Sequence, residues 1–362
     1  MEDLSLELGG INEAIITHED LYKQNQPQAG QDLAALLIQR GLMYFQFGLL
    51  AESNSDCSRA AEILEQAQRE GRLPDENELA KAYACLGMVS YKTDDMFQAL
   101  QFMSQSIGIW EGMLGTQKFI DKEMMLHAFY IRGAICNSMT FNMDEAISDY
   151  EKGISIAKNL METDADFDQD KLALCYMGVG QSYDQKEDYI ESEEYYDQAI
   201  EIWEKMRQKG QDIDRGNLAK AYMNRGANNY QYKEYKEAIA DYSKCISIIG
   251  QQLEDGEQLE VFDIFMAYKN RARAFQEEHE VRAAIDDHVV ATRAIKFGFN
   301  NHPELQELYY ESLGETLELV ENQSDKAEFE EILNEFFYPM ADVPKTESAE
   351  SAHEFMHNVI KQ

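Results

Sequence analysis

The sequence predicts an all-α protein made of repeated helix pairs, and two observations carry this prediction. A block of about 46 residues recurs, because Leu172-Ala173-Leu174-Cys175-Tyr176-Met177 reappears 46 residues later as Leu218-Ala219-Lys220-Ala221-Tyr222-Met223. Each block also holds a glycine or alanine at one fixed place and two small residues, seven apart, further on. Repeats of this length bury their apolar faces only by stacking on one another, so the recurrence predicts a solenoid.

Composition limits the classes of protein to which the chain can belong. Its 362 residues are 44% hydrophobic, enough for a sizeable core. The 32 basic and 68 acidic residues give a net charge of −36, which argues against nucleic acid and anionic membranes as direct partners. No apolar run approaches the roughly 18 residues of a membrane span. Five cysteines without CxxC spacing predict reduced thiols in a cytoplasmic protein: Cys57, Cys85, Cys136, Cys175 and Cys245.

Residues 1–32 are predicted to form an N-terminal capping helix or half repeat. The stretch from Ile11 to Leu21 resembles the second helix of a pair, with Ala14 at the small-residue position and Leu21 seven residues later. The acidic start, Met1-Glu2-Asp3, lacks the apolar segment of a secretory signal peptide, so we expect no such signal.

Residues 33–298 are predicted to hold six repeats, each a pair of helices. The first helix of each pair carries a glycine, or an alanine in the sixth, about eight residues in: Gly41, Gly87, Gly133, Gly180, Gly226 and Ala272. A glycine inside a helix costs about 1 kcal/mol relative to alanine. Its recurrence therefore predicts a close approach between helices that a β-carbon would block.

The second helix of each pair is marked by small residues. One lies roughly twelve residues after the repeat glycine: Ser53, Ala99, Ala146, Ser192, Ala238 and Ala284. Another follows seven residues later: Ala60, Ser106, Gly153, Ala199, Cys245 and Ala291. A variable filler residue lies between them: Cys57, Met103, Tyr150, Tyr196, Tyr242 and His288. Residues i and i+7 share one face of a helix, so the second helix is expected to pack tightly along this stripe.

The segment Tyr222–Ile246, YMNRGANNYQYKEYKEAIADYSKCI, closely resembles the tetratricopeptide repeat. The resemblance covers residues 33–298 and extends more loosely over 10–337. It implies a right-handed superhelical array, an α-solenoid, as a single elongated domain. The chain departs from the family in repeat length, which is usually 34 residues, and in lacking the proline that often ends the second helix. Without this proline the apolar spacing of Ile200–Met206 predicts a second helix about two turns longer.

The last part of the chain is predicted to close the array. Residues 299–338 resemble a degenerate seventh repeat or C-terminal cap, with Leu313-Gly314 and Ala327 at repeat positions. Its acidic face suits the solvent-facing end that a repeat array needs: Glu328, Glu330, Glu331 and Glu335. Residues 339–362 read as a flexible tail that can hold a short helix.

The most enzyme-like motif is His353-Glu354-Phe355-Met356-His357, an HExxH spacing that places both imidazoles on one helix face, as in zinc proteases. Only five residues follow it, so a third ligand downstream is missing. We therefore expect no enzyme, no resident metal and no cofactor, with adventitious metal binding as the alternative.

Three further motifs are predicted to be structural. Asp164–Asp170 resembles the start of an EF-hand loop, but Gln169 and Cys175 replace its glycine and glutamate. We expect a solvated acidic loop in which Asp170 caps the next helix. Gly178-Val179-Gly180 lies inside a predicted helix, so its glycines serve packing. Trp110 and Trp203 occupy matching places in two second helices and are expected in the core.

The resemblance also implies a groove lined by the first helices, at positions three and six residues before each repeat glycine and one and four after it. The residues expected to contact a partner are Phe45, Lys81, Met88, Tyr91, Tyr130, Asn137, Met177, Gln181, Lys220, Met223, Tyr230, Lys269 and Arg273. Methionine surfaces adapt to irregular partners, and tyrosine supplies large contact area. The alternative is that these residues pack between neighbouring repeats.

These observations predict a non-catalytic scaffold or adaptor that binds a protein or peptide segment in its concave groove. A groove rich in Met and Tyr on an acidic protein favours an apolar segment with basic flanks. The carboxylate clamp of some family members, which binds acidic tails, is matched strictly only at Asn224. Two alternatives stay open: an acidic regulatory subunit or inhibitor that masks a basic, nucleic-acid-binding protein, and an intracellular receptor for a peptide signal.

Overall fold

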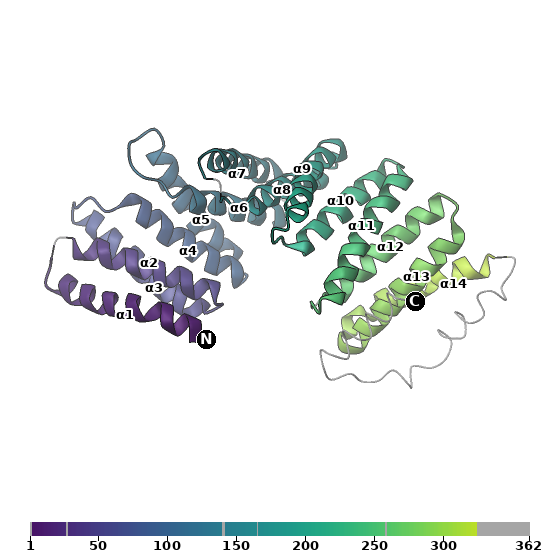
Figure 1. Ribbon diagram of the computed structural model, residues 1–362, viewed down its shortest axis with the longest axis horizontal. Helices are drawn as coiled ribbons and strands as arrows, with labels where there is room; N and C mark the ends of the chain where they lie inside the picture. The colour runs from purple at the N-terminus through teal and green to yellow at the C-terminus, as the bar shows by residue number, and fades with distance from the viewer. Residues whose placement is uncertain (1, 27, 140–141, 165, 258, 324–362) are drawn as a thin grey trace. The chain divides into compact units, whose positions relative to one another are not determined.

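The computed structural model describes residues 2–26, 28–139, 142–164, 166–257 and 259–323. Within these ranges every element is helical, from α1 to α14 with one short 3₁₀ helix, as the repeat pattern predicts (Figure 1). The chain divides into two compact units, residues 1–187 and 188–362, a boundary that the sequence repeat does not mark.

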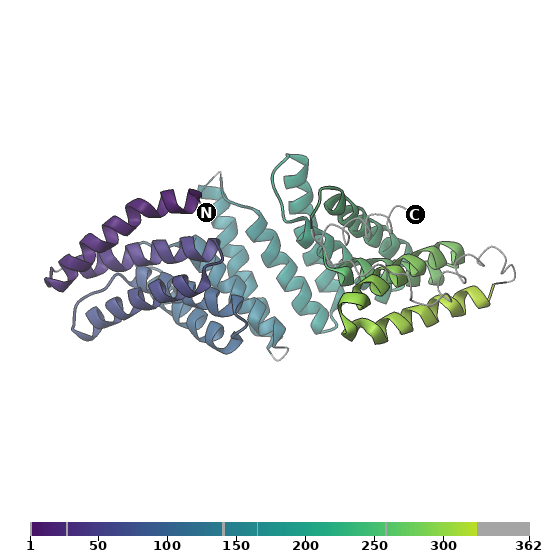
Figure 2. The ribbon, with the colours of Figure 1, turned by 90° about the horizontal axis from the view of Figure 1, so that it is seen from below.

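Unit 1 is a stack of helices that pack in chain order (Figure 2). Its helices are α1 (Glu2–Lys23), α2 (Ala29–Gln46), α3 (Leu50–Arg69), α4 (Glu76–Lys92), α5 (Met96–Met113), α6 (Lys122–Ser138), α7 (Met143–Thr163) and α8 (Asp170–Gln185). The pairs are α2/α3, α4/α5 and α6/α7; each second helix also contacts the next first helix, and the first helices contact one another. Helix α1 packs on α2 as a second helix would.

Unit 2 repeats this arrangement. Its elements are α9 (Tyr189–Gln208), α10 (Arg215–Gln231), α11 (Tyr235–Glu254), α12 (Val261–Glu277), α13 (Val281–Asn301), the 3₁₀ helix η1 (Pro303–Leu305) and α14 (Gln306–Glu321). The pairs are α10/α11 and α12/α13, and α13 packs on α14. Helix α9 runs through the apolar stretch Ile200–Met206 to Gln208, so the predicted extension of this second helix is confirmed.

The repeat glycines allow the close helix contact that the sequence predicts. A β-carbon on Gly41 would lie 2.6 Å from Cys57 Sγ, and one on Gly226 would lie 2.9 Å from the Tyr242 ring. Gly87 meets Met103 and Gly133 meets Tyr150 in the same way. Real β-carbons rarely approach other atoms so closely, so in these four repeats the filler residue of the second helix occupies the space that glycine leaves.

The core holds the other residues that the sequence assigned to packing. Trp110 and Trp203 are fully buried, and the Trp110 indole N–H donates to Asn77 Oδ1 at 2.9 Å. A β-carbon on Gly178 would meet the Tyr150 ring, so this glycine serves packing. All five cysteines are buried free thiols.

Glycine, rather than proline, follows most of the second helices. A glycine with positive φ comes directly after the last turn at four places: Gly71, Gly115, Gly210 and Gly256. At the first of these, the N–H of Gly71 donates to Gln68 and the N–H of Arg72 to Ala67, the paired bonds of a Schellman motif. These glycines are a signal in the sequence that the prediction, based on the missing proline, did not use.

A ladder of arginine–aspartate pairs links the helices within several repeats. Each arginine directly precedes the repeat glycine or alanine and donates two parallel hydrogen bonds of 2.6–2.9 Å to an aspartate on its second helix: Arg40–Asp56, Arg132–Asp149, Arg225–Asp241 and Arg271–Asp287. Three of these arginines also donate to the preceding second helix, 28 residues back: to Asn12, Asp197 and Ser243. Each guanidinium therefore joins up to three successive helices.

The ladder corrects the predicted register of the N-terminal helix. Since Asn12 contacts Arg40 as Asp197 contacts Arg225, Ala14 corresponds to Ala199. Ala14 therefore stands at the second small position of a second helix. The prediction, with Leu21 seven residues later, puts Ala14 at the first, because a single small residue cannot distinguish two positions seven apart on the same face.

Candidate functional site

The predicted groove residues all lie on first helices: α2, α4, α6 and α8 in unit 1, and α10 and α12 in unit 2. Their exposure differs widely, so the two units are considered separately. Exposure matters because a side chain that is buried between repeats is not available to a partner.

In unit 1 most of these side chains pack between repeats. Met88, Asn137 and Met177 are each 6% exposed. Phe45, Tyr91 and Tyr130 pack against the core cluster that contains Met88. A charge placed at buried Met177 would therefore test folding rather than binding.

The polar groove positions of unit 1 are partly occupied by neighbours. Asn137 accepts a hydrogen bond from the Ser182 hydroxyl at 2.8 Å. Lys81 Nζ lies 3.1 Å from Glu78 and 3.9 Å from Asp121. Gln181 is half-buried on α8. Packing between repeats, the alternative interpretation, describes much of this face.

In unit 2 one predicted cation is used internally. Lys269 is buried, with Nζ 3.1 Å from both Glu311 Oε1 and Glu315 Oε2 on α14, and it lies 5.4 Å from the centre of the Phe265 ring. Its charge is therefore compensated by the next repeat. By contrast Lys220 is exposed and Met223 is half-buried.

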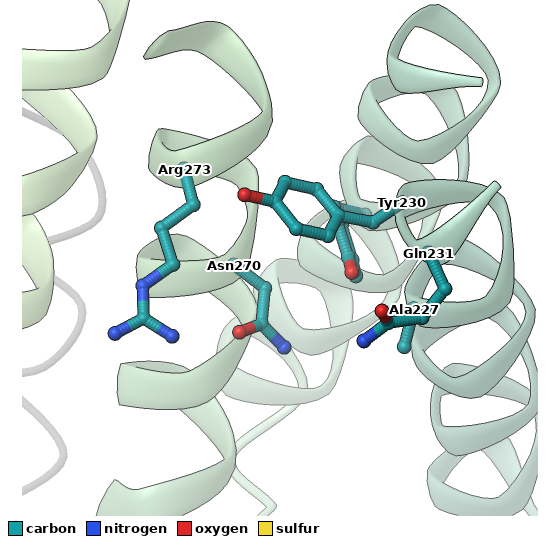
Figure 3. Close-up of a pocket in the computed structure, with 6 residues that line it drawn as sticks. Ala227, Tyr230, Gln231, Asn270 and Arg273 are labelled. Atoms are coloured by element: carbon teal, nitrogen blue, oxygen red, sulfur yellow. The ribbon is translucent and has the colours of Figure 1, made fainter. Parts of the chain in front are cut away.

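A first pocket lies between α10 and α12 (Figure 3). It is lined by Ala227, Tyr230 and Gln231 of α10, Tyr242 of α11, and Asn270 and Arg273 of α12. Figure 3 shows Tyr230 pointing across the pocket toward α12, where Arg273 and Asn270 lie one turn apart. Burial, with the carboxylate of Glu277, raises the pKa of Tyr230, so its hydroxyl stays a hydrogen-bond donor at neutral pH.

A second pocket lies between α12 and α14. It is lined by Arg273 and Gln276 of α12, His288 of α13, and Glu315, Glu318, Leu319 and Asn322 from α14 and its C-terminal end. Burial tends to raise the pKa of Glu315, but Lys269 and Arg273 lower it on balance, so this carboxylate is ionised at neutral pH. Arg273 Nη2 lies 3.1 Å from Glu315 Oε1, so the guanidinium stands between the two pockets with its charge partly satisfied.

The sizes of the pockets indicate what they can hold. Their volumes are about 140 Å³ and 260 Å³, below the roughly 300–1,000 Å³ of sites for small molecules. Each suits a single side chain of a larger partner. Each is lined in part by the filler residue of its repeat, Tyr242 or His288, for which the sequence predicts a packing role alone.

Sequence reasoning also missed Glu315 and Glu318 as pocket residues. They belong to the divergent seventh repeat, in which Gly314 stands at the repeat position. Glu315 and Glu318 follow this glycine by one and four residues, which is the groove spacing, so the same rule applied to the seventh repeat would have found both.

The acidic loop before α8 uses its carboxylates locally. Asp164 accepts the N–H of Asp166, and Asp168 accepts the N–H of Asp170 at 3.0 Å. The predicted cap, Asp170, is thus the first residue of the helix, and Asp168 supplies the bond to the backbone. Across the described ranges no group of three or more His, Cys, Asp or Glu side chains is arranged to hold a metal ion.

Two other expectations concern the HExxH motif and membrane-spanning helices. The motif His353-Glu354-Phe355-Met356-His357 lies outside the described residues. Among the helices that are described, none combines the length and the apolar character that crossing a bilayer requires.

Comparison with known proteins bears on the fold. A family model described as Tetratricopeptide repeat matches residues 173–204. BtubC (BKLC) from P. vanneervenii is 18% identical with a TM-score of 0.50, over 68% of this chain and 90% of that one. The apo form of RapI is 13% identical with a TM-score of 0.50, over 83% of this chain and 99% of that one. No curated protein sequence matches the chain. At these identities the structural similarity is evidence for the fold alone.

Proposed function

The chain is a tetratricopeptide repeat protein, and on this premise we propose that the face formed by α10, α12 and α14 binds a segment of a partner protein. The observation that carries the proposal is the pair of adjacent pockets between successive first helices, which share Arg273. An extended segment lying across these helices would place successive side chains in the two pockets. The chain then acts as a non-catalytic adaptor or scaffold.

The partner segment is proposed to be apolar with basic flanks. Tyr230 and half-buried Met223 supply an aromatic and a polarizable surface beside the first pocket. The net charge of −36 attracts basic partners and speeds their encounter. We place this function in the cytoplasm, a proposal supported by the five free, buried thiols.

The proposal is tested by affinity capture from lysate of the source cells with the tagged full chain, followed by mass spectrometry. Tyr230→Ala removes the aromatic side chain of the first pocket and should lower partner retention about tenfold. Lys244→Ala, an exposed change on α11 away from the pockets, is the matched control and should retain the partner. Circular dichroism of each variant establishes that it is folded.

The salt dependence of partner capture distinguishes this function from the alternative that the net charge favours. A partner that stays bound at high salt and is lost with Tyr230→Ala supports recognition by the α10–α12–α14 face. A basic partner that is captured only at low salt, and equally well by Tyr230→Ala, would contradict it and favour an acidic regulatory subunit that masks a basic protein.

A further inference from the structure

We propose that the pocket between α12 and α14 receives a lysine or arginine side chain of the partner segment. This inference rests on the proposed function, because it names the chemistry of one position in the same face. It is carried by the charges that line the pocket and by the apolar and uncharged side chains beside them, Leu319 and His288.

The charges that line this pocket favour a cation. Lys269 pairs with Glu311 and Glu315, and Arg273 pairs with Glu315, so these four charges sum to zero. Glu318, one turn further along α14, is exposed and forms no ion pair with any described residue. The carboxylate of Glu318 is therefore available to a ligand, and it would attract a cation and repel an acidic ligand.

His288 adds a polar group without adding positive charge. Its side chain is 1% exposed, and burial lowers its pKa to about 4, so the ring is neutral at pH 7. Nε2 lies 3.0 Å from the Gln276 amide nitrogen, and Nδ1 has no hydrogen-bond partner among the described residues. When Gln276 donates to Nε2, the ring proton is on Nδ1 and lacks an acceptor. Nδ1 is itself inaccessible from the pocket, so the ring forms a neutral wall there and adds no positive charge that would oppose a cation.

The apolar part of the pocket suits the stem of a long basic side chain. Leu319 lies on α14 one residue after Glu318, and both line the pocket. Lysine and arginine bury their methylene groups against such a surface while the charged end reaches a carboxylate. The volume of about 260 Å³ accommodates one side chain of this kind rather than a whole ligand.

The experiment uses the full chain labelled with ¹³C and ¹⁵N at histidine. The probes are N-acetyl-arginine amide, N-acetyl-lysine amide and, as the acidic control, N-acetyl-glutamate amide. The imidazole signal of His288 is identified by its disappearance in His288→Gln. We expect the two basic probes to shift this signal saturably at millimolar concentrations and the glutamate probe to leave it in place.

Two matched variants locate the binding. Glu318→Gln should weaken the basic probes about fivefold, whereas Glu321→Gln, an equal change of charge at an exposed position of α14 outside the pocket, should leave their affinity unchanged. The inference is overturned if no probe shifts the His288 signal, if the glutamate probe binds equally, or if Glu318→Gln binds as the unaltered chain does. Loss of partner capture with Tyr230→Ala would still stand in each of those cases, so the two proposals fail separately.

Discussion

The arginine that precedes a repeat glycine shows how a charge can be held inside this fold. The side chains of Arg132 and Asp149 are 13% and 2% exposed, and two parallel hydrogen bonds join them. Burial raises the pKa of Asp149 despite the pull of Arg132 in the other direction. Repeat two carries Leu86 and Phe102 at the same two places, and both belong to one apolar cluster. The chain thus has a buried ion pair in one repeat and an apolar pair at the equivalent positions of another.

This comparison predicts how unit 1 responds to substitution. Arg132→Leu alone should destabilise unit 1 by about 3–5 kcal/mol, because Asp149 is left buried and unpaired. The double variant Arg132→Leu/Asp149→Phe reproduces the apolar pair of repeat two and should recover most of that loss. Urea unfolding followed by circular dichroism measures both. A double variant that is no more stable than Arg132→Leu would show that the pair cannot be exchanged for its apolar counterpart.

At the scale of the element, the turns that join first and second helices place one residue in the left-handed region. Gly48 serves in the first repeat, whereas Asp94, Lys233 and His279 adopt φ near 60° without being glycine. An L-residue held in this conformation costs roughly 1–2 kcal/mol. These turns therefore retain strain that the glycines after the second helices avoid.

We expect Lys233→Gly to stabilise unit 2 by about 0.5–1 kcal/mol, since relief of this strain exceeds the extra entropy of glycine in the unfolded chain. Gly210→Ala, at φ 71° after α9, should destabilise it by about 1 kcal/mol. Thermal unfolding measures both changes. A lower melting temperature for Lys233→Gly would mean that the lysine side chain contributes more than its backbone strain removes.

The helix pairs follow from the sequence because a recurring glycine and its filler residue report a contact that every repeat must make. The groove is harder to predict. Lys269 stands at a groove position, yet it is buried, and Glu311 and Glu315 of α14 compensate its charge. Spacing identifies the face on which a residue lies, but the charge and size of its neighbour in the following repeat decide whether it stays exposed.

At the scale of the whole molecule, the acidic excess acts on both units. A net charge of −36 opposes compaction, and dissolved salt screens that repulsion. Some ion pairs between repeats, such as Lys152–Glu111, have both side chains exposed to solvent, and these contribute little stability that screening could remove. Screening should therefore stabilise this protein on balance.

We expect the melting temperature to rise by about 2–4 °C between about 20 and 300 mM NaCl, which corresponds to roughly 1 kcal/mol for units of this size. Differential scanning calorimetry at constant pH measures it, with an uncharged osmolyte at matched osmolality as the control. A melting temperature that falls as salt is added would indicate that the ion pairs between repeats outweigh the global repulsion.

The arginine ladder also bears on how such a chain can change in length over evolution. Three of these arginines find their partners at the same two distances along the chain, 16 residues ahead on the second helix of their own pair and 28 residues back on the preceding second helix: Arg40, Arg225 and Arg271. Duplication or loss of one whole repeat would leave both distances intact, whereas an insertion inside a helix would break them. The ladder is therefore compatible with the gain or loss of complete repeats and is disrupted by insertions within a helix. The number of pockets along a face can then change while the contacts between neighbouring helix pairs are kept.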